Sequence, residues 1–181
     1  MDEKLFNPSL LYDLDFSTTS CTFKPTLGPK EPGEGLVMRP LERSDYAKGF
    51  LNLLSQLTKV GSVDGEQFVE QFERMKKSSN HYVVVIEDVI RSRIVASATL
   101  LVEYKFIHGA AMRGRIEDLV VSDRMRGKQL GKLLVETLLK LAVKLGCYKL
   151  SLDADDQVKS FYEKFGFRDG ATLFMQLRFF D

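Results

Sequence analysis

The chain has 181 residues, of which 44% are hydrophobic and 28% charged, and its formal net charge is +1. This composition fits one globular domain with an ordinary core, and the small net charge gives no global field that would recruit nucleic acid or a membrane surface. The acidic start and the lack of a long apolar run predict no secretory leader and no integral membrane segment, while peripheral membrane association stays open. Two cysteines and two histidines predict no disulfide framework and no metal site, and they favour a reducing, cytoplasmic compartment.

Residues 1–35 differ in composition from the rest of the chain. They hold four of the five prolines and three glycines, which predicts an irregular N-terminal arm laid over the domain that residues 36–181 form. Apolar residues along the arm could anchor it, so disorder is not the expectation. These residues are Leu5, Phe6, Leu10, Leu11, Leu14 and Phe16.

The first half of the domain shows one strand, two helices and two more strands. Pro40 ends the first strand or places it at a sheet edge. Ser44 or Asp45 can cap the first helix, and Asp64 with Gln67 forms a plausible capping pair for the second. The predicted strands are residues 36–41, 81–87 and 94–102, and the predicted helices are residues 44–56 and 64–77. A polar connection over residues 105–113 follows.

Strands and helices alternate in the second half. A strand over residues 116–121 leads into a long helix that ends at about Lys144, with leucines on one face. A strand over residues 148–153, a short helix over residues 158–165 and a last strand over residues 173–180 follow. This order predicts an α+β (mixed α/β) fold, in which a mixed, mostly antiparallel sheet carries helices on both faces.

The junction between the strand at 116–121 and the long helix carries two glycines and several cations. A helix N-terminus has unpaired N–H groups and partial positive charge, and glycines let a ligand approach closely, so this junction predicts a phosphate or pyrophosphate seat. Three residues separate Gly127 from Gly131 and Leu133 follows Lys132, which excludes a Walker A loop. The dinucleotide fingerprint also fails, because it needs three glycines. A basic helix start on a solvated surface is the alternative.

Residues 126–131 resemble the pyrophosphate-binding signature of the GNAT acetyltransferase superfamily, Arg or Gln-x-x-Gly-x-Gly or Ala. Gln129 departs from it, since it stands at the first glycine of the signature. Other segments extend the resemblance to the glucosamine 6-phosphate N-acetyltransferase family over nearly the whole chain. These are residues 105–108, 114–118, 146–149 and 161–167, with shorter matches at 32–36 and 57–58.

The resemblance implies the GNAT acyl-CoA N-acyltransferase fold and a reaction. Acetyl-CoA would donate its acetyl group directly, in a ternary complex, to the amine of glucosamine 6-phosphate, and the product would feed UDP-N-acetylglucosamine synthesis. The resemblance also implies a homodimer with active sites at the subunit interface and the last strand packed across it. No metal is implied.

The resemblance also assigns roles to residues. Tyr162 would donate a proton to the CoA thiolate, although a core aromatic beside Phe161 is the alternative from spacing alone. Glu117 is the favoured proton acceptor and Asp153 a further anionic candidate. The CoA-binding candidates are Leu119, Val120, Val121, Arg126, Gly127, Lys128, Gln129, Leu130, Gly131, Lys132, Asp153 and Tyr162. The sugar-binding candidates are Thr58, Lys105, Phe106, Ile107, His108, Glu117, Asp118, Leu119, Tyr148, Lys149 and Arg178.

Some features leave alternatives open. Because Glu117 and Asp118 are adjacent on a strand, their side chains should face opposite sides. Val158 and Ala154 stand where related sequences usually carry Asn and Cys, which puts a polar contact in doubt.

Two other functions are possible. A GNAT enzyme acting on a protein or polyamine amine would present an acidic groove instead of the cationic candidates Lys105, His108, Lys149 and Arg178. A non-catalytic CoA-binding module is the third possibility.

Overall fold

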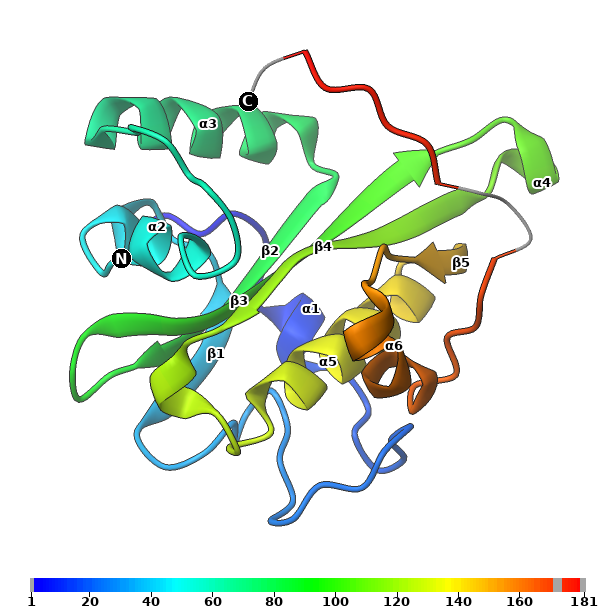
Figure 1. Cartoon of the computed structure of the whole chain (residues 1–181), viewed down its shortest axis with the longest axis horizontal. Helices are drawn as coiled ribbons and strands as arrows, with labels where there is room; N and C mark the ends of the chain where they lie inside the picture. Colours follow the sequence, from blue (N-terminus) through cyan, green and yellow to red (C-terminus); the bar gives the residue numbers. More distant parts are fainter. Residues whose placement is uncertain (1, 171–173, 180–181) are drawn as a thin grey trace.

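A five-stranded sheet forms the centre of the protein in the computed structural model, which describes residues 2–170 and 174–179 (Figure 1). The strand order is β1-β2-β3-β4-β5; the first four strands are antiparallel, and β5 runs parallel to β4. The strands are β1 Leu36–Pro40, β2 His81–Asp88, β3 Arg93–Tyr104, β4 Met112–Val121 and β5 Cys147–Ser151. The predicted mixed, mostly antiparallel sheet is confirmed.

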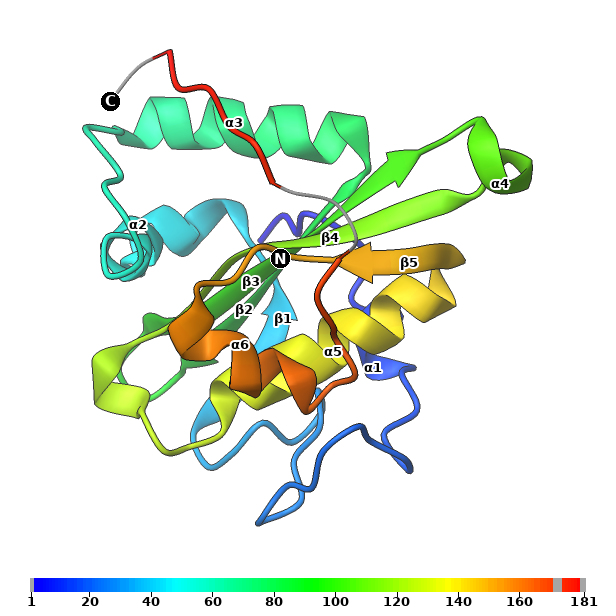
Figure 2. The same cartoon turned by 45° about the vertical axis from the view of Figure 1, so that its right-hand side comes forward.

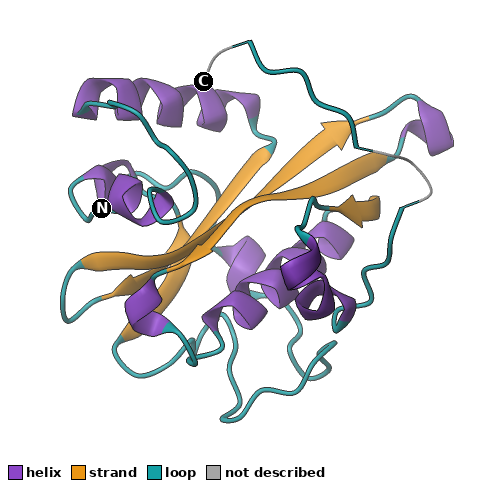
Figure 3. Cartoon of the chain, viewed as in Figure 1, coloured by secondary structure: helices purple, strands orange, loops and turns teal. Residues whose placement is uncertain are grey.

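Helices cover both faces of this sheet (Figure 3). One face carries the long helix α5, the one-turn helix α1 and the outer helix α6, and the other face carries α2 and α3. The short helix α4 lies at the tip of the β3–β4 hairpin. The bounds are α1 Ser9–Tyr12, α2 Phe50–Leu54, α3 Gly65–Ser78, α4 Ile107–Ala110, α5 Leu130–Lys144 and α6 Asp156–Glu163.

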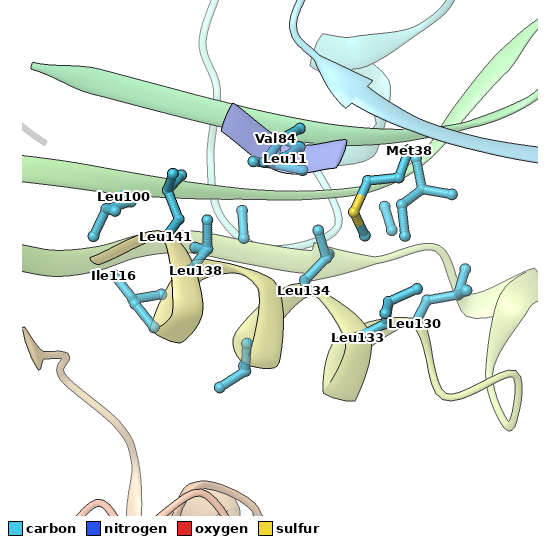
Figure 4. Close-up of a cluster of buried hydrophobic side chains, with 14 of the residues drawn as sticks. Leu11, Met38, Val84, Leu100, Ile116, Leu130, Leu133, Leu134, Leu138 and Leu141 are labelled. Carbon is cyan, nitrogen blue, oxygen red and sulfur yellow. The ribbon is translucent and has the colours of Figure 1, made fainter. Parts of the chain in front are cut away.

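The larger core lies between the sheet and α5 (Figure 4). The leucines predicted on one face of the long helix are buried here, and each such burial stabilises the fold by about 1.5–3 kcal/mol. Leu11 of the N-terminal arm is fully buried in the same cluster. The residues labelled in Figure 4 are Leu11, Met38, Val84, Leu100, Ile116, Leu130, Leu133, Leu134, Leu138 and Leu141. This packing fixes the position of the α5 N-terminus beside the end of β4.

The helix predicted over residues 44–56 is wrong, because the chain forms two shorter elements there. A 3₁₀ turn spans Arg43–Tyr46 and is capped by Glu42. Gly49 then adopts φ +77°, which breaks the helix before α2 begins. The carboxylate of Asp45 is fully buried and binds Arg39 at 2.7 Å, so tertiary ion pairing rather than helix propensity sets this segment.

The chain ends differ from the prediction as well. The last strand, expected over residues 173–180, is wrong for residues 174–179, which have no regular secondary structure and are exposed. Residues 173 and 180 lie outside the described part of the chain. Hydrophobic pattern alone cannot supply the neighbouring strand that a β-strand needs for its hydrogen bonds.

Candidate active site

The strands β4 and β5 diverge part-way along their length. They pair from Met112 to Arg115, where Ser151 is the last partner on β5, while β4 continues to Val121. The other edge of β4 stays paired with β3 as far as Val121. No other strand in the described part of the chain pairs with residues 117–121 on the β5 side. This edge therefore offers backbone N–H and C=O groups to an extended ligand, which would add to it as a further strand does.

The β4–α5 loop, residues 122–129, lies at the end of that open edge. Gly127 has φ +80° and Gln129 has φ +61°, and α5 starts at Leu130. A Cβ on Gly127 would meet no neighbour, so the left-handed backbone rather than space favours glycine there. The first N–H groups of α5 have no partner within the helix, and Lys128 is exposed beside them. Unpaired N–H groups, a glycine and a cation therefore lie together at this junction, and the pyrophosphate seat stays a prediction.

The two other signature residues have clear physical reasons. Gly131 lies within the first turn of α5, and a Cβ there would be 3.7 Å from both Phe161 and Val121, so alanine would also fit. Arg126 pairs with Asp123 at 2.5 Å on the surface, and both side chains are mostly exposed. An exposed pair of this kind contributes little stability, so an anion could take over Arg126 at small cost.

Arg115 brings two candidate catalytic carboxylates together. Its Nε donates to Glu117 and its Nη2 donates to Asp153, which follows β5. Burial opposes the charge on Arg115, but the two carboxylates outweigh it and hold the pKa of Arg115 above its ordinary value. We did not predict a role for Arg115. The sequence does indicate that Arg115 and Glu117 are neighbours, because side chains two positions apart on a strand lie on one face.

Asp118 does not face away from Glu117, so that expectation is wrong. A β-bulge interrupts the β3–β4 register at this point, and Asp118 adopts φ +52°. Glu117 lies opposite Thr99, and Asp118 lines a cavity of about 190 Å³ that Thr99 also lines, on the α2 and α3 side of the sheet. Burial, and next the negative charge of Glu117, raise the pKa of the Asp118 carboxyl.

Tyr162 lies on α6 beside the diverging strands. Its ring packs edge-on against Phe161 and Phe167, with centroids 5.0 and 6.1 Å away, as the alternative of a core aromatic expects. Tyr162 also lines a cavity of about 230 Å³ together with Asp153 and Ala154. Burial raises the pKa of the Tyr162 phenol, which keeps it protonated. Val158, in the first turn of α6, is 45% exposed.

The sugar-binding candidates fall into separate groups. His108 in α4 stacks against Tyr148 in β5 with ring centroids 4.4 Å apart, and the Lys149 ammonium lies 5.9 Å from the same Tyr148 ring. Lys105 pairs with Glu103 at the end of β3. Phe106 and Ile107, at the same hairpin tip, are exposed.

Two sugar-binding candidates lie elsewhere. Thr58 lies in the loop that follows α2, and α2 lies on the opposite side of the molecule from α4 in Figures 1 and 2. Arg178 is exposed in residues 174–179. A single chain therefore gathers His108, Tyr148 and Lys149 but does not bring Thr58 to them.

Comparison with known proteins identifies the family. The Acetyltransferase (GNAT) family matches residues 48–167, which include β4, the β4–α5 loop and α6. This chain belongs to the GNAT acetyltransferase family. The GNAT fold, with its mixed sheet and helices on both faces, is thereby confirmed, and GNAT acetyltransferases use acetyl-CoA.

Individual relatives and a solved structure are similar to this chain over most of its length. The chain is 51% identical over 164 residues to "Probable glucosamine 6-phosphate N-acetyltransferase" of Drosophila melanogaster, covering 90% of this chain and 75% of the relative. It is 44% identical over 134 residues to "Glucosamine 6-phosphate N-acetyltransferase" of Arabidopsis thaliana, covering 74% and 90%. The crystal structure of glucosamine-6-phosphate N-acetyltransferase from Arabidopsis thaliana superposes with a TM-score of 0.77, at 41% identity and covering 81% of this chain and 99% of that one.

Two further findings concern ions and membranes. Among the residues that the structure describes, no three His, Cys, Asp or Glu side chains gather where they could hold a metal ion. Across the same residues, no helix is long and apolar enough to span a bilayer.

Proposed function

We propose that this GNAT acetyltransferase transfers the acetyl group of acetyl-CoA to the amine of D-glucosamine 6-phosphate, which gives N-acetyl-D-glucosamine 6-phosphate and CoA. The observation that carries the proposal is the open edge of β4 running into the left-handed β4–α5 loop. The names of the relatives from Drosophila and Arabidopsis supply the acceptor. The product would enter UDP-N-acetylglucosamine synthesis.

The coenzyme would lie along the divergence of β4 and β5. The backbone of Leu119, Val120 and Val121 would bond the pantetheine arm, and their side chains remain in the core or beside it. The pyrophosphate would lie on the N–H groups of residues 127–132, with Arg126 and the lysines neutralising its charge. This arrangement would hold the thioester near the bulge at Asp118 and near Arg115 with its partners Glu117 and Asp153.

Direct transfer in a ternary complex needs a neutral amine beside the thioester and an acid for the leaving thiolate. Glu117 would accept the amine proton, directly or through water, and Asp153 would sit near the amine. Tyr162, protonated because burial raises its pKa, would donate its proton to the thiolate of CoA. The amine nitrogen then holds the acetyl group, and the carbon–sulfur bond is broken.

Lys105, His108 and Lys149 would bind the sugar phosphate. His108 and Lys149 both lie close to the Tyr148 ring, and Lys105 lies on the same β3–β4 hairpin as His108. Phe106, Ile107 and Tyr148 would contact the sugar ring. Thr58 and Arg178 would complete the site only if a second chain supplies one or both of them.

A homodimer is therefore part of the proposal. The segment 174–179 exposes Phe174, Met175, Leu177 and Phe179 by 64%, 87%, 77% and 80%. Apolar surface of this kind marks an interaction site. A partner chain would cover it and bring Arg178 to the partner's sugar site.

The dimer has its own test. By analytical sedimentation, the wild-type protein should have the mass of two chains and the Leu177→Asp variant the mass of one chain. Ile90→Asp is the control, because Ile90 is 76% exposed in the β2–β3 turn, away from this segment. A wild-type mass equal to that of a single chain would contradict the dimer, and a Leu177→Asp variant that stays dimeric would contradict its placement on residues 174–179.

The reaction is tested by following thiol release from acetyl-CoA. Glucosamine 6-phosphate should give release and product, whereas glucose 6-phosphate, which has a hydroxyl in place of the amine, should give none. Spermidine and a lysine peptide test the alternative of a polyamine or protein substrate. No release with any amine, together with measurable CoA binding, would indicate a non-catalytic CoA-binding module.

A further inference from the structure

Residues 16–24 of the N-terminal arm run antiparallel along α5 (Figure 2). At the C-terminal half of the helix, the Lys140 ammonium donates to the Thr18 carbonyl oxygen at 2.6 Å and lies 5.4 Å from the centre of the Phe16 ring. Further along, the Ser20 N–H donates to the two oxygens of Glu136 at 3.1 and 3.0 Å. The arm thus follows one stripe of the helix towards its N-terminus.

The arm ends this path at Gln129. The Gln129 Nε2 donates to the Lys24 carbonyl oxygen at 2.7 Å, and the Lys24 N–H donates back to the Gln129 Oε1 at 3.4 Å. Gln129 has φ +61°, a left-handed backbone that glycine adopts freely and that is strained for other residues. Its own side chain therefore offsets that strain by bonding the arm.

We propose that Gln129 is a positioning residue, and that docking of residues 16–24 on α5 holds the β4–α5 loop in the conformation that receives the coenzyme. This inference rests on the proposed function, because it assumes that the pyrophosphate of CoA lies on this loop. A glycine at position 129 would adopt the same backbone conformation, but it would not hold the loop in that conformation. The glutamine side chain holds the loop by bonding to the arm.

The far end of the arm is anchored firmly enough to transmit such a restraint. Glu136 is only 1% exposed, and its carboxylate is satisfied by the Ser20 N–H and by Lys140 at 3.7 Å. A buried carboxylate that loses its partners is costly, so the arm is held to α5 at this point. Coupling between two binding events is reciprocal, so CoA should also tighten the arm.

Two substitutions at position 129 separate the side-chain bonds from the backbone. Gln129→Met keeps the length of the side chain and removes both bonds to Lys24. It should raise the Kd for CoA about three- to tenfold, because a hydrogen bond contributes a net ~0.5–1.5 kcal/mol and ~1.4 kcal/mol is a tenfold change. Gln129→Gly removes the bonds and the backbone cost together, so it should recover part of this loss. The KM for acetyl-CoA should follow Kd, while kcat at saturation stays within about twofold.

A double-mutant cycle tests the coupling itself. Lys140→Met removes a contact between the arm and the C-terminal half of α5, whereas the loop lies at the N-terminus of this helix. In the wild-type background it should weaken CoA binding, and in the Gln129→Met background it should add nothing, because the arm no longer reaches the loop. Melting temperatures check that each variant folds.

Hydrogen exchange gives a measurement that does not depend on Lys140→Met folding. CoA should slow exchange at residues 18–24 in the wild type and not in Gln129→Met. Equal CoA affinity in the wild type and Gln129→Met, or equal protection of the arm in both, would overturn the inference. Wild-type protein that binds no CoA would instead overturn the proposed function, so the two failures are distinguishable.

Discussion

Arg115 of β4 and Asp153 form an ion pair across the point where β4 and β5 diverge. The same guanidinium holds Glu117, so one cation fixes two carboxylates beside the open edge of β4. If it were removed, the two carboxylates would repel each other and lose their orientation. The orientation of these two candidate carboxylates therefore depends on one side chain.

Arg115→Met should lower kcat by up to about 10²-fold, the loss that a displacement of 1 Å can cause in a reacting group. Arg115→Lys should recover little, because an ammonium lacks the planar fork that binds two carboxylates at once. Steady-state kinetics with acetyl-CoA and glucosamine 6-phosphate measure both effects.

The control for Arg115 is Arg113→Met, two residues earlier on β4. Arg113 donates to the Ser151 hydroxyl at 3.1 Å and not to the carboxylates. An equal loss of kcat in the Arg113 and Arg115 variants would show that general damage to β4, not the orientation of Glu117 and Asp153, causes the effect.

Tyr162→Phe should lower kcat by about ten- to a thousandfold, at or below the usual range for acid–base groups, with the Kd for CoA nearly unchanged. Burial raises the pKa of Tyr162, so the protonated acid persists as pH rises, and kcat should not fall through its ionisation until above about pH 10. The pH profile of kcat in the two proteins measures this. A variant with wild-type kcat would remove Tyr162 from the acid role.

The sequence predicts the sheet and α5 because their signals are local. Alternating or continuous apolar runs predict β2 and β3, and the leucine spacing predicts the buried face of α5. The glycines and cations predict the anion seat for the same reason, since the strand, loop and helix that form it are consecutive.

The remaining features depend on contacts between distant residues. The bulge at Asp118 is a mismatch in register with β3, which the composition of β4 does not reveal. Arg115 finds Asp153 38 positions later in the chain. The segment 174–179 has a strand-like pattern, but its hydrogen-bonding partner would lie on a second chain in the proposed dimer. Gln129 departs from the family signature, and Lys24, to which its side chain bonds, lies 105 positions away.

The two glycines of the signature should respond oppositely to alanine. Gly127→Ala places a Cβ on a residue with φ +80° and should cost about 1–2 kcal/mol in the folded loop, which raises the KM for acetyl-CoA. Gly131→Ala is the matched variant within helix α5. Its Cβ would lie at an ordinary 3.7 Å from Phe161 and Val121, so it should raise stability by about 0.4–1 kcal/mol and leave the KM nearly unchanged. Urea denaturation and steady-state kinetics decide this, and equal effects of the two substitutions would contradict the assigned geometry.

Asp118→Asn should change stability in a pH-dependent way. The folded protein raises the pKa of Asp118, because burial and then the charge of Glu117 disfavour the carboxylate. Stability from this group is therefore greatest at low pH, where it is protonated, and is lost as pH rises through the unfolded and then the folded pKa. Asparagine carries no charge and tolerates the left-handed backbone at this position, so the bulge should remain. The variant should melt above the wild type at pH 7.5 and close to it at pH 4. The difference should be small, because Asp118 is exposed to solvent, which screens its charge. A variant that gains more at pH 4 than at pH 7.5 would show that the carboxylate is stabilising and would contradict the raised pKa of Asp118.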